Sequence, residues 1–326
     1  MIEQSRFGFI KYEGPFLKSF TALPSPELRG CIEKYVGQEF DLSAYPGKYM
    51  PSVMLLPSER ILMSFCYHDT SYLIEDGSRR FRFNTLVMGE HSLQTQYCVG
   101  DIPKVNKQMF AVFRPGGFFR LFNIYDGEVR NVCIKSDEIV GAHIMQIKET
   151  MDNAATIEER VCILDRYFLH KLNCRRGIMS SDDTANAVRL MAANKGRLKI
   201  EEVSREMTVS KRTLERGFMD RIGLSPKEFS KVVRFKNVLN AIYPINSVDW
   251  QDLVVSYGYF DQSHLIDDFK AATTFTPESF MKQKGKSIIL FGREALILTK
   301  PLETQHESYK GFMKEIEEFG EARYSE

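Results

Sequence analysis

The chain has 326 residues, of which 43% are hydrophobic and 27% are charged, and its formal net charge is +1. That length suffices for two or three domains, and the composition is ordinary for a soluble globular protein. The six cysteines include no Cys-x-x-Cys pair, which argues against a disulfide framework or a zinc centre and predicts reduced thiols in the cytoplasm. No apolar stretch reaches the length of a membrane span.

The first 175 residues are rich in short β-prone runs bounded by Pro, Gly, Asp or Asn. Residues 114–117 predict a turn that leads into an aromatic strand. After Ser136 the apolar period becomes helical, with amphipathic helices expected over 139–148 and 157–172. We therefore predict an α+β chain whose amino-terminal part is a small β-barrel or sandwich followed by helices. The β-prone runs are 53–56, 61–67, 71–75, 81–83, 85–88 and 109–113.

This amino-terminal part shows no arrangement of catalytic residues. The histidines do not have the His-x-His or His-x-x-x-His spacing of a metal site. Arg114-Pro-Gly-Gly117 resembles a phosphate loop but lacks the Lys-Ser/Thr pair that a Walker motif requires. We expect no enzymatic activity, no metal and no cofactor.

Residues 200–222 have the pattern of a helix, a tight turn and a second helix. Ser210 can cap the second helix through its hydroxyl. Leu214, Phe218 and Ile222 are four residues apart, so they form one apolar stripe that predicts contact with a core.

The other face of this second helix carries Arg212, Glu215 and Arg216. Arginines at i and i+4 suit a helix in the DNA major groove, because the guanidinium group can pair with O6 and N7 of guanine. An ordinary solvated face would show the same spacing, so the spacing alone does not distinguish a DNA-contacting face from a solvated one.

The same pattern recurs at an offset of 51 residues. The upstream helix repeats as well, with one extra residue in the second intervening turn. A duplicated helical unit of about fifty residues indicates modular architecture. Leu214, Phe218, Pro226 and Phe229 recur as Leu265, Phe269, Pro277 and Phe280.

A helix is predicted between the two units. Ser225-Pro-Lys-Glu228 has the Ser-x-x-Glu capping box with proline at the first helical position. The helix should run from Pro226 to Ile242 and end near Pro244. Its length would set the spacing of the two units close to one turn of B-DNA, roughly 34 Å.

The motifs of both units resemble the double helix-turn-helix domain of AraC/XylS-type transcription regulators. They are Val209-Ser-Lys-Arg-Thr-Leu-Glu-Arg-Gly-Phe218, Gly223-Leu-Ser-Pro226 and Gly258-Tyr-Phe-Asp-Gln-Ser-His-Leu265. The resemblance covers about 186–286 and implies an all-α domain with two recognition helices in successive major grooves of double-stranded DNA. The base contacts it implies are Arg212, Glu215, Arg216, Gln262, Ser263, Ile266 and Asp267.

The amino-terminal part resembles the sensor domain that precedes this domain in many relatives, most of all over Phe113–Phe122. In that family such domains bind small effectors or dimerise the protein, and the resemblance leaves both open. For an effector, His68, His91 and Arg114 are the candidate polar groups of an apolar pocket.

The resemblance sets four expected segments. They are a sensor or dimerisation domain at 1–175, a linker at 176–185, the DNA-binding domain at 186–286 and an extension at 287–326. Within the extension, a hairpin and a charged helix are expected to pack on the sensor domain or on a second subunit.

Charge distinguishes the two helix-turn-helix units. Residues 186–240 hold 13 Lys and Arg against 6 Asp and Glu, whereas residues 241–286 hold 4 against 6. The first unit should therefore bind the polyanion better, because phosphate neutralisation supplies most non-specific affinity. The expected phosphate contacts are Lys211, Lys227, Lys231, Arg234 and Lys236.

The sequence thus predicts a cytoplasmic, sequence-specific transcription regulator, expected as a homodimer with RNA polymerase as a further partner and no membrane association. Activator is the working assignment, although no residue separates it from a repressor. One alternative is a sensor or scaffold that has lost specific DNA binding, since the offset places Ser263 and Asp267 where the first unit has arginines. Another is a methyl-accepting cysteine protein, but no cysteine has its Pro-Cys-His-Arg context.

Overall fold

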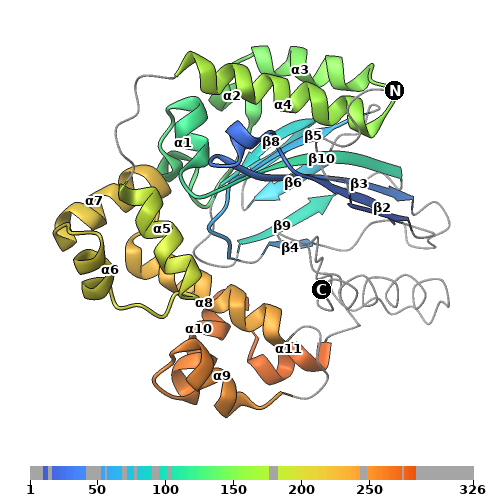
Figure 1. Cartoon of the computed structure of the whole chain (residues 1–326). Coiled ribbons are helices and arrows are strands. Elements are labelled where there is room, and N and C mark those ends of the chain that lie inside the picture. The colour runs from blue at the N-terminus through green and yellow to red at the C-terminus, as the bar shows by residue number, and fades with distance from the viewer. Residues whose placement is uncertain are drawn as a thin grey trace. The chain divides into compact units, whose positions relative to one another are not determined.

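The computed structural model describes two compact units (Figure 1). The first comprises Met1–Ser52, Arg60–Gly89 and Tyr97–Ser180, and the second comprises Val53–Glu59, Glu90–Gln96 and Ser181–Glu326. The residues it describes are 10–13, 17–41, 53–55, 57–67, 72–76, 79–89, 95–100, 105–175, 183–242, 248–273 and 275–283.

The strands form two separate sheets. Of the two predicted architectures for the amino-terminal part, the sandwich is therefore confirmed and the barrel is wrong. The larger sheet pairs its strands in antiparallel fashion. Its order is β1 (Ile10–Glu13), β2 (Leu17–Ala22), β3 (Ile32–Asp41), β10 (Val105–Phe113), β5 (Leu62–Cys66), β8 (Thr85–Met88) and β11 (Cys133–Lys135). The smaller sheet has the order β4 (Val53–Leu55), β9 (Thr95–Gly100), β6 (Tyr72–Asp76) and β7 (Arg79–Phe83).

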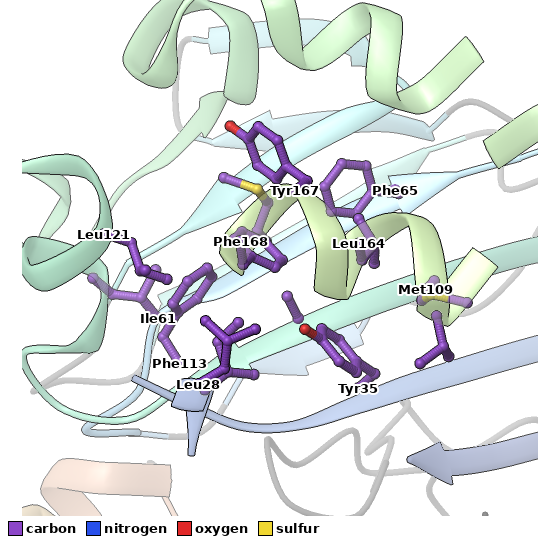
Figure 2. Close-up of a cluster of buried hydrophobic side chains, with 14 of the residues drawn as sticks. Leu28, Tyr35, Ile61, Phe65, Met109, Phe113, Leu121, Leu164, Tyr167 and Phe168 are labelled. Atoms are coloured by element: carbon purple, nitrogen blue, oxygen red, sulfur yellow. The ribbon is translucent and has the colours of Figure 1, made fainter. Parts of the chain in front are cut away.

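The core of the first unit lies between one face of the larger sheet and helix α4 (Ile157–Cys174) (Figure 2). Phe168 of α4 meets Phe113 of β10 edge to face, with ring centroids 5.5 Å apart. Asp165, also on α4, is buried and accepts hydrogen bonds from the Ser25 amide at 2.9 Å and the Tyr35 hydroxyl at 3.1 Å. Because a buried carboxylate is costly unless it is hydrogen-bonded, these contacts fix α4 on the sheet.

Two predicted elements of this unit differ in the structure. The segment after Arg114-Pro-Gly-Gly117 is helix α1 (Gly117–Phe122), not a strand. The chain turns at Gly116, whose φ is 73°, and Asp126 in the short helix η2 (Asp126–Val129) accepts from the amides of Gly116 and Phe119. A second short helix, η1, spans Pro26–Leu28.

The single helix expected over 139–148 is two helices, α2 (Ser136–Val140) and α3 (His143–Asp152). Gly141 separates them with a φ of 95°, a conformation that no residue of a right-handed helix adopts. The predicted helical periodicity is confirmed, and the break at Gly141 is a difference that the apolar spacing does not predict.

The second unit contains seven helices among its described residues: α5 (Asp183–Ala193), α6 (Ile200–Glu206), α7 (Lys211–Ile222), α8 (Pro226–Ile242), α9 (Trp250–Tyr257), α10 (Gln262–Thr273) and α11 (Pro277–Gln283). The predicted bounds of α8 are confirmed. Its capping box is present, since the Glu228 amide donates to Ser225 Oγ at 3.2 Å and the Ser225 amide donates to Glu228 Oε2 at 2.9 Å.

Helix α8 supplies side chains to two separate apolar clusters. Its first half packs with α5, α6 and α7, and its second half packs with α9, α10 and α11. The single helix therefore joins the two cores in one domain. The contributing residues are Phe229, Val232 and Val233 in the first cluster, and Phe235, Val238, Leu239 and Ile242 in the second.

Several expectations concern residues outside those described. They include His68, His91, most of the expected linker, and the hairpin and helix of the extension. Within the described residues, no helix is both long and apolar enough to cross a bilayer. The same residues contain no group of three His, Cys, Asp or Glu side chains arranged to hold a metal ion.

Candidate nucleic-acid interface

The first helix-turn-helix consists of α6, the turn 207–210 and α7. Ser210 caps α7 as predicted, because its hydroxyl accepts from the Thr213 amide at 3.1 Å. The Ser204 hydroxyl donates to the Val209 carbonyl at 2.6 Å and ties the turn to α6. Leu214 and Phe218 are buried, so one face of α7 is committed to the core.

The opposite face of α7 is open to solvent. Arg212, Glu215 and Arg216 are all exposed, and Met219 beside them is 45% exposed. Neither arginine forms an ion pair with a described residue. Arg216 also borders a surface cavity of about 410 Å³ that α7 shares with the start of α5. The two guanidinium groups are therefore available to a ligand approaching this face.

The second helix-turn-helix consists of α9, the turn 258–261 and α10. Asp261 takes the capping place of Ser210, since its carboxylate accepts from the His264 amide at 2.8 Å. Gly258 ends α9 in the left-handed conformation, with a φ of 69°. Leu265 and Phe269 are buried, so α10 is oriented on its core by the same means as α7.

The outer face of α10 presents different hydrogen-bonding groups from that of α7. Gln262, Ser263 and Asp267 are exposed, and Ile266 is half-buried. This face contains one amide, one hydroxyl and one carboxylate where α7 has two arginines. The predicted asymmetry of residue types is therefore presented on the surfaces of the two helices.

Asp268 on α10 is linked to α8. One of its oxygens lies 2.9 Å from Lys231 Nζ, and the other lies 4.0 Å from Arg234 and 3.7 Å from His264. Arg234 also lies over the ring of Tyr259, 5.2 Å from its centroid. Burial, and after it the charge of Asp268, raises the pKa of the Tyr259 hydroxyl.

The five predicted phosphate contacts have different surroundings. Lys227 and Lys211 are both exposed, and Lys211 is paired with Glu201. The pKa of the Glu201 carboxyl is lowered, and its hydrogen bond with Lys211 is the largest cause. Lys231 and Arg234, as described, share Asp268.

Lys236 is buried, and its Nζ lies 2.7 Å from Glu59 Oε1 in the 53–59 segment of the same unit. Contact with phosphate would require this ion pair to open. The sequence offers no signal for the pair, because 177 positions separate the two residues.

Of the three predicted effector residues, Arg114 alone lies within the described part of the chain. It is exposed, and its Nε donates to the Arg29 carbonyl at 2.8 Å. A group that the sequence reasoning missed lies on the larger sheet, on the face opposite α4. Lys34, Gln38 and Gln108 are buried there, and Gln108 Nε2 donates to Gln38 Oε1 at 3.3 Å. Because side chains alternate along a strand, these three residues lie on the other face of the sheet from Tyr35 and Met109.

Comparison with known proteins identifies the class of the second unit. Residues 203–283 match the family model described as a helix-turn-helix domain. This region is an AraC-type helix-turn-helix domain, which confirms the resemblance drawn from its motifs. No curated protein sequence matches the chain.

Three solved structures show a distant likeness. Apo ToxT from Vibrio cholerae, crystallised as a variant, has 11% identity and a TM-score of 0.42, with 76% of this chain and 97% of that chain covered. Wild-type ToxT from Vibrio cholerae bound to an unsaturated fatty acid has 11% identity and a TM-score of 0.41, with 76% and 94% covered. The AraC-like transcriptional activator CuxR has 14% identity and a TM-score of 0.21, with 74% and 83% covered.

Proposed function

We propose that the chain is a sequence-specific transcription regulator that reads DNA chiefly through α7. The observation that carries this proposal is the pair Arg212 and Arg216, exposed on one face of a capped helix whose other face is buried. A recognition helix needs such an arrangement, because its base-contacting side chains must reach the groove while the helix stays fixed on its domain. Glu215 between them can accept from a cytosine amino group.

The amino-terminal compact unit is proposed to control DNA binding through a small-molecule effector. Its buried Lys34, Gln38 and Gln108 lie on a sheet face that also carries Val36 and Phe110. Small-molecule sites combine apolar lining with a few polar groups, so this face is a better candidate for effector binding than the exposed Arg114. We propose further that the protein is a cytoplasmic homodimeric activator that contacts RNA polymerase and has no enzymatic activity.

The test begins with selection of a binding site from a random duplex library by the full chain. Arg212→Ala and Arg216→Ala should then each weaken binding to the selected site by about 1–3 kcal/mol, as expected for a lost base contact. Binding to unrelated DNA should change much less. The matched control is Arg189→Ala, which removes an exposed arginine from α5.

Lys227→Ala provides a second control, because the loss of a phosphate contact should weaken binding to all DNA sequences alike. If the α7 variants also lost specific and non-specific affinity equally at fixed salt, α7 would not read bases. A wild-type chain that enriches no sequence would instead favour the scaffold alternative, which the acidic residues of α10 support.

A further inference from the structure

The two helix-turn-helix turns differ by one inserted residue. In each turn a residue in the left-handed conformation follows the first helix: Thr208 with a φ of 55° and Gly258 with a φ of 69°. In each turn a capping residue, Ser210 or Asp261, begins the second helix. One residue, Val209, stands between these landmarks in the first turn, whereas two stand between them in the second.

The structure identifies the inserted residue as Phe260. Val209 packs against the first apolar cluster, and Tyr259 belongs to the second, with 8% of its surface exposed. Tyr259 therefore takes the place of Val209. Phe260 is 91% exposed, the highest value among the large exposed hydrophobic side chains of the described residues. The insertion thus adds an aromatic ring that does not stabilise the fold by burial.

The backbone around Phe260 is held by neighbouring groups. Its amide donates to His264 Nδ1 at 3.4 Å, and the His264 amide donates to the Asp261 carboxylate at 2.8 Å. The His264 ring also meets Tyr259 edge to face at 5.3 Å. The Phe260 ring consequently has a defined point of attachment directly before the first turn of α10.

Phe260 stands just before the amino-terminal residues of α10, and in a recognition helix those residues contact base edges in the major groove. The first turn of α10 supplies Gln262 and Ser263 but neither lysine nor arginine. Positive charge lies nearby on α8, where Arg234 Nη1 donates to the Gly258 carbonyl at 3.5 Å and Lys231 pairs with Asp268 of α10. An aromatic ring placed there matches the apolar feature of the groove, the C5-methyl group of thymine.

We propose that Phe260 makes an apolar contact with a thymine methyl group in the major groove entered by α10. This inference rests on the proposed function and adds a specificity residue to the second unit. The second helix-turn-helix then reads DNA by apolar contact, whereas the first helix-turn-helix reads it by guanidinium hydrogen bonds.

The experiment uses the full chain and its selected duplex. Each thymine in the half-site of α10 is replaced in turn by deoxyuridine, which lacks only the C5-methyl group. One replacement should weaken wild-type binding about fourfold, the equivalent of one buried methyl-sized group. Phe260→Ala should weaken binding to the thymine duplex by at least as much and should bind the thymine and deoxyuridine duplexes equally.

Val255→Ala is the matched control, because Val255 is 75% exposed but lies on α9, outside the turn. This variant should keep the full response to deoxyuridine. Phe260 is nearly fully exposed, so its removal should leave the thermal unfolding midpoint unchanged, and a lowered midpoint would overturn the claim that the ring is free of the fold.

Independent, additive effects of Phe260→Ala and deoxyuridine would overturn the contact while leaving the proposed function intact. Unchanged affinity in Phe260→Ala would do the same. A wild-type chain that selects no sequence would overturn the proposed function and this inference together, so the two failures are distinguishable.

Discussion

The two helix-turn-helix units have kept the same interior and acquired different surfaces. Phe218 meets Phe229 at 5.5 Å with the rings at 74°, and Phe269 meets Phe280 at 5.3 Å with the rings at 76°. The duplication is therefore preserved in ring geometry as well as in sequence. Close packing explains this conservation between the repeats, because a change in one buried ring would strain its neighbours.

Equivalent surface positions are less constrained. At the position where α10 has Asp268, α7 has Gly217, and a Cβ there would lie 2.6 Å from Thr184 Oγ1 of α5. The first unit uses the position for close approach of a helix, whereas the second uses it to bind Lys231 of α8. The helices packed against each copy of the repeat therefore determine which residue stands at this equivalent position.

The largest predicted effect tests the shared interior. Phe218→Ala and Phe269→Ala should each lower the unfolding free energy by about 3–5 kcal/mol, because both rings are fully buried. Urea unfolding of the full chain, with hydrogen exchange to locate the loss in α7 or α10, measures it. A cost below about 1 kcal/mol for one variant alone would show that the two cores are not equivalent.

The buried ion pair between Lys236 of α8 and Glu59, which lies outside the repeat, should have the next largest effect. Glu59→Gln should lower the unfolding free energy by about 3 kcal/mol, because it leaves the buried Lys236 ammonium without this carboxylate. The double variant Glu59→Leu with Lys236→Met should recover most of the loss. Additive losses in the double variant would show that the two side chains do not act as a pair.

The two left-handed turn positions should respond in opposite directions. Thr208→Gly should raise the unfolding free energy by about 1 kcal/mol, since a β-branched residue at a φ of 55° is strained. Gly258→Ala should lower it by about the same amount. Chemical unfolding of both variants is the measurement, and a stabilised Gly258→Ala would contradict the left-handed assignment.

The smallest predicted effect concerns the acidic face of α10. Asp267 is exposed, so Asp267→Ala should raise affinity for DNA of any sequence by roughly threefold, through removal of one repulsive charge. The gain should shrink as salt increases. Lost affinity, confined to sites with one particular base, would show instead that Asp267 accepts a hydrogen bond from a cytosine amino group.

The sequence predicted most accurately where local interactions decide the outcome. The bounds of α8 and the cap at Ser210 depend on residues within one helical turn, and both are confirmed. The break at Gly141 was missed because glycine adopts helical and left-handed conformations with similar ease. The helical course of 117–122 was missed because it depends on Asp126, which sequence periodicity does not register.

The sequence by itself determined the repeat, its apolar stripes and the family, because each is written in spacings that one helix or one turn can satisfy. Only the tertiary structure decided which charged side chains remain available. Lys236 and Lys227 look alike in sequence, yet one is buried against Glu59 and the other is exposed. Likewise, Tyr259 is buried and adjacent Phe260 is exposed. Burial depends on partners distant in sequence, so the composition of a local segment cannot specify it.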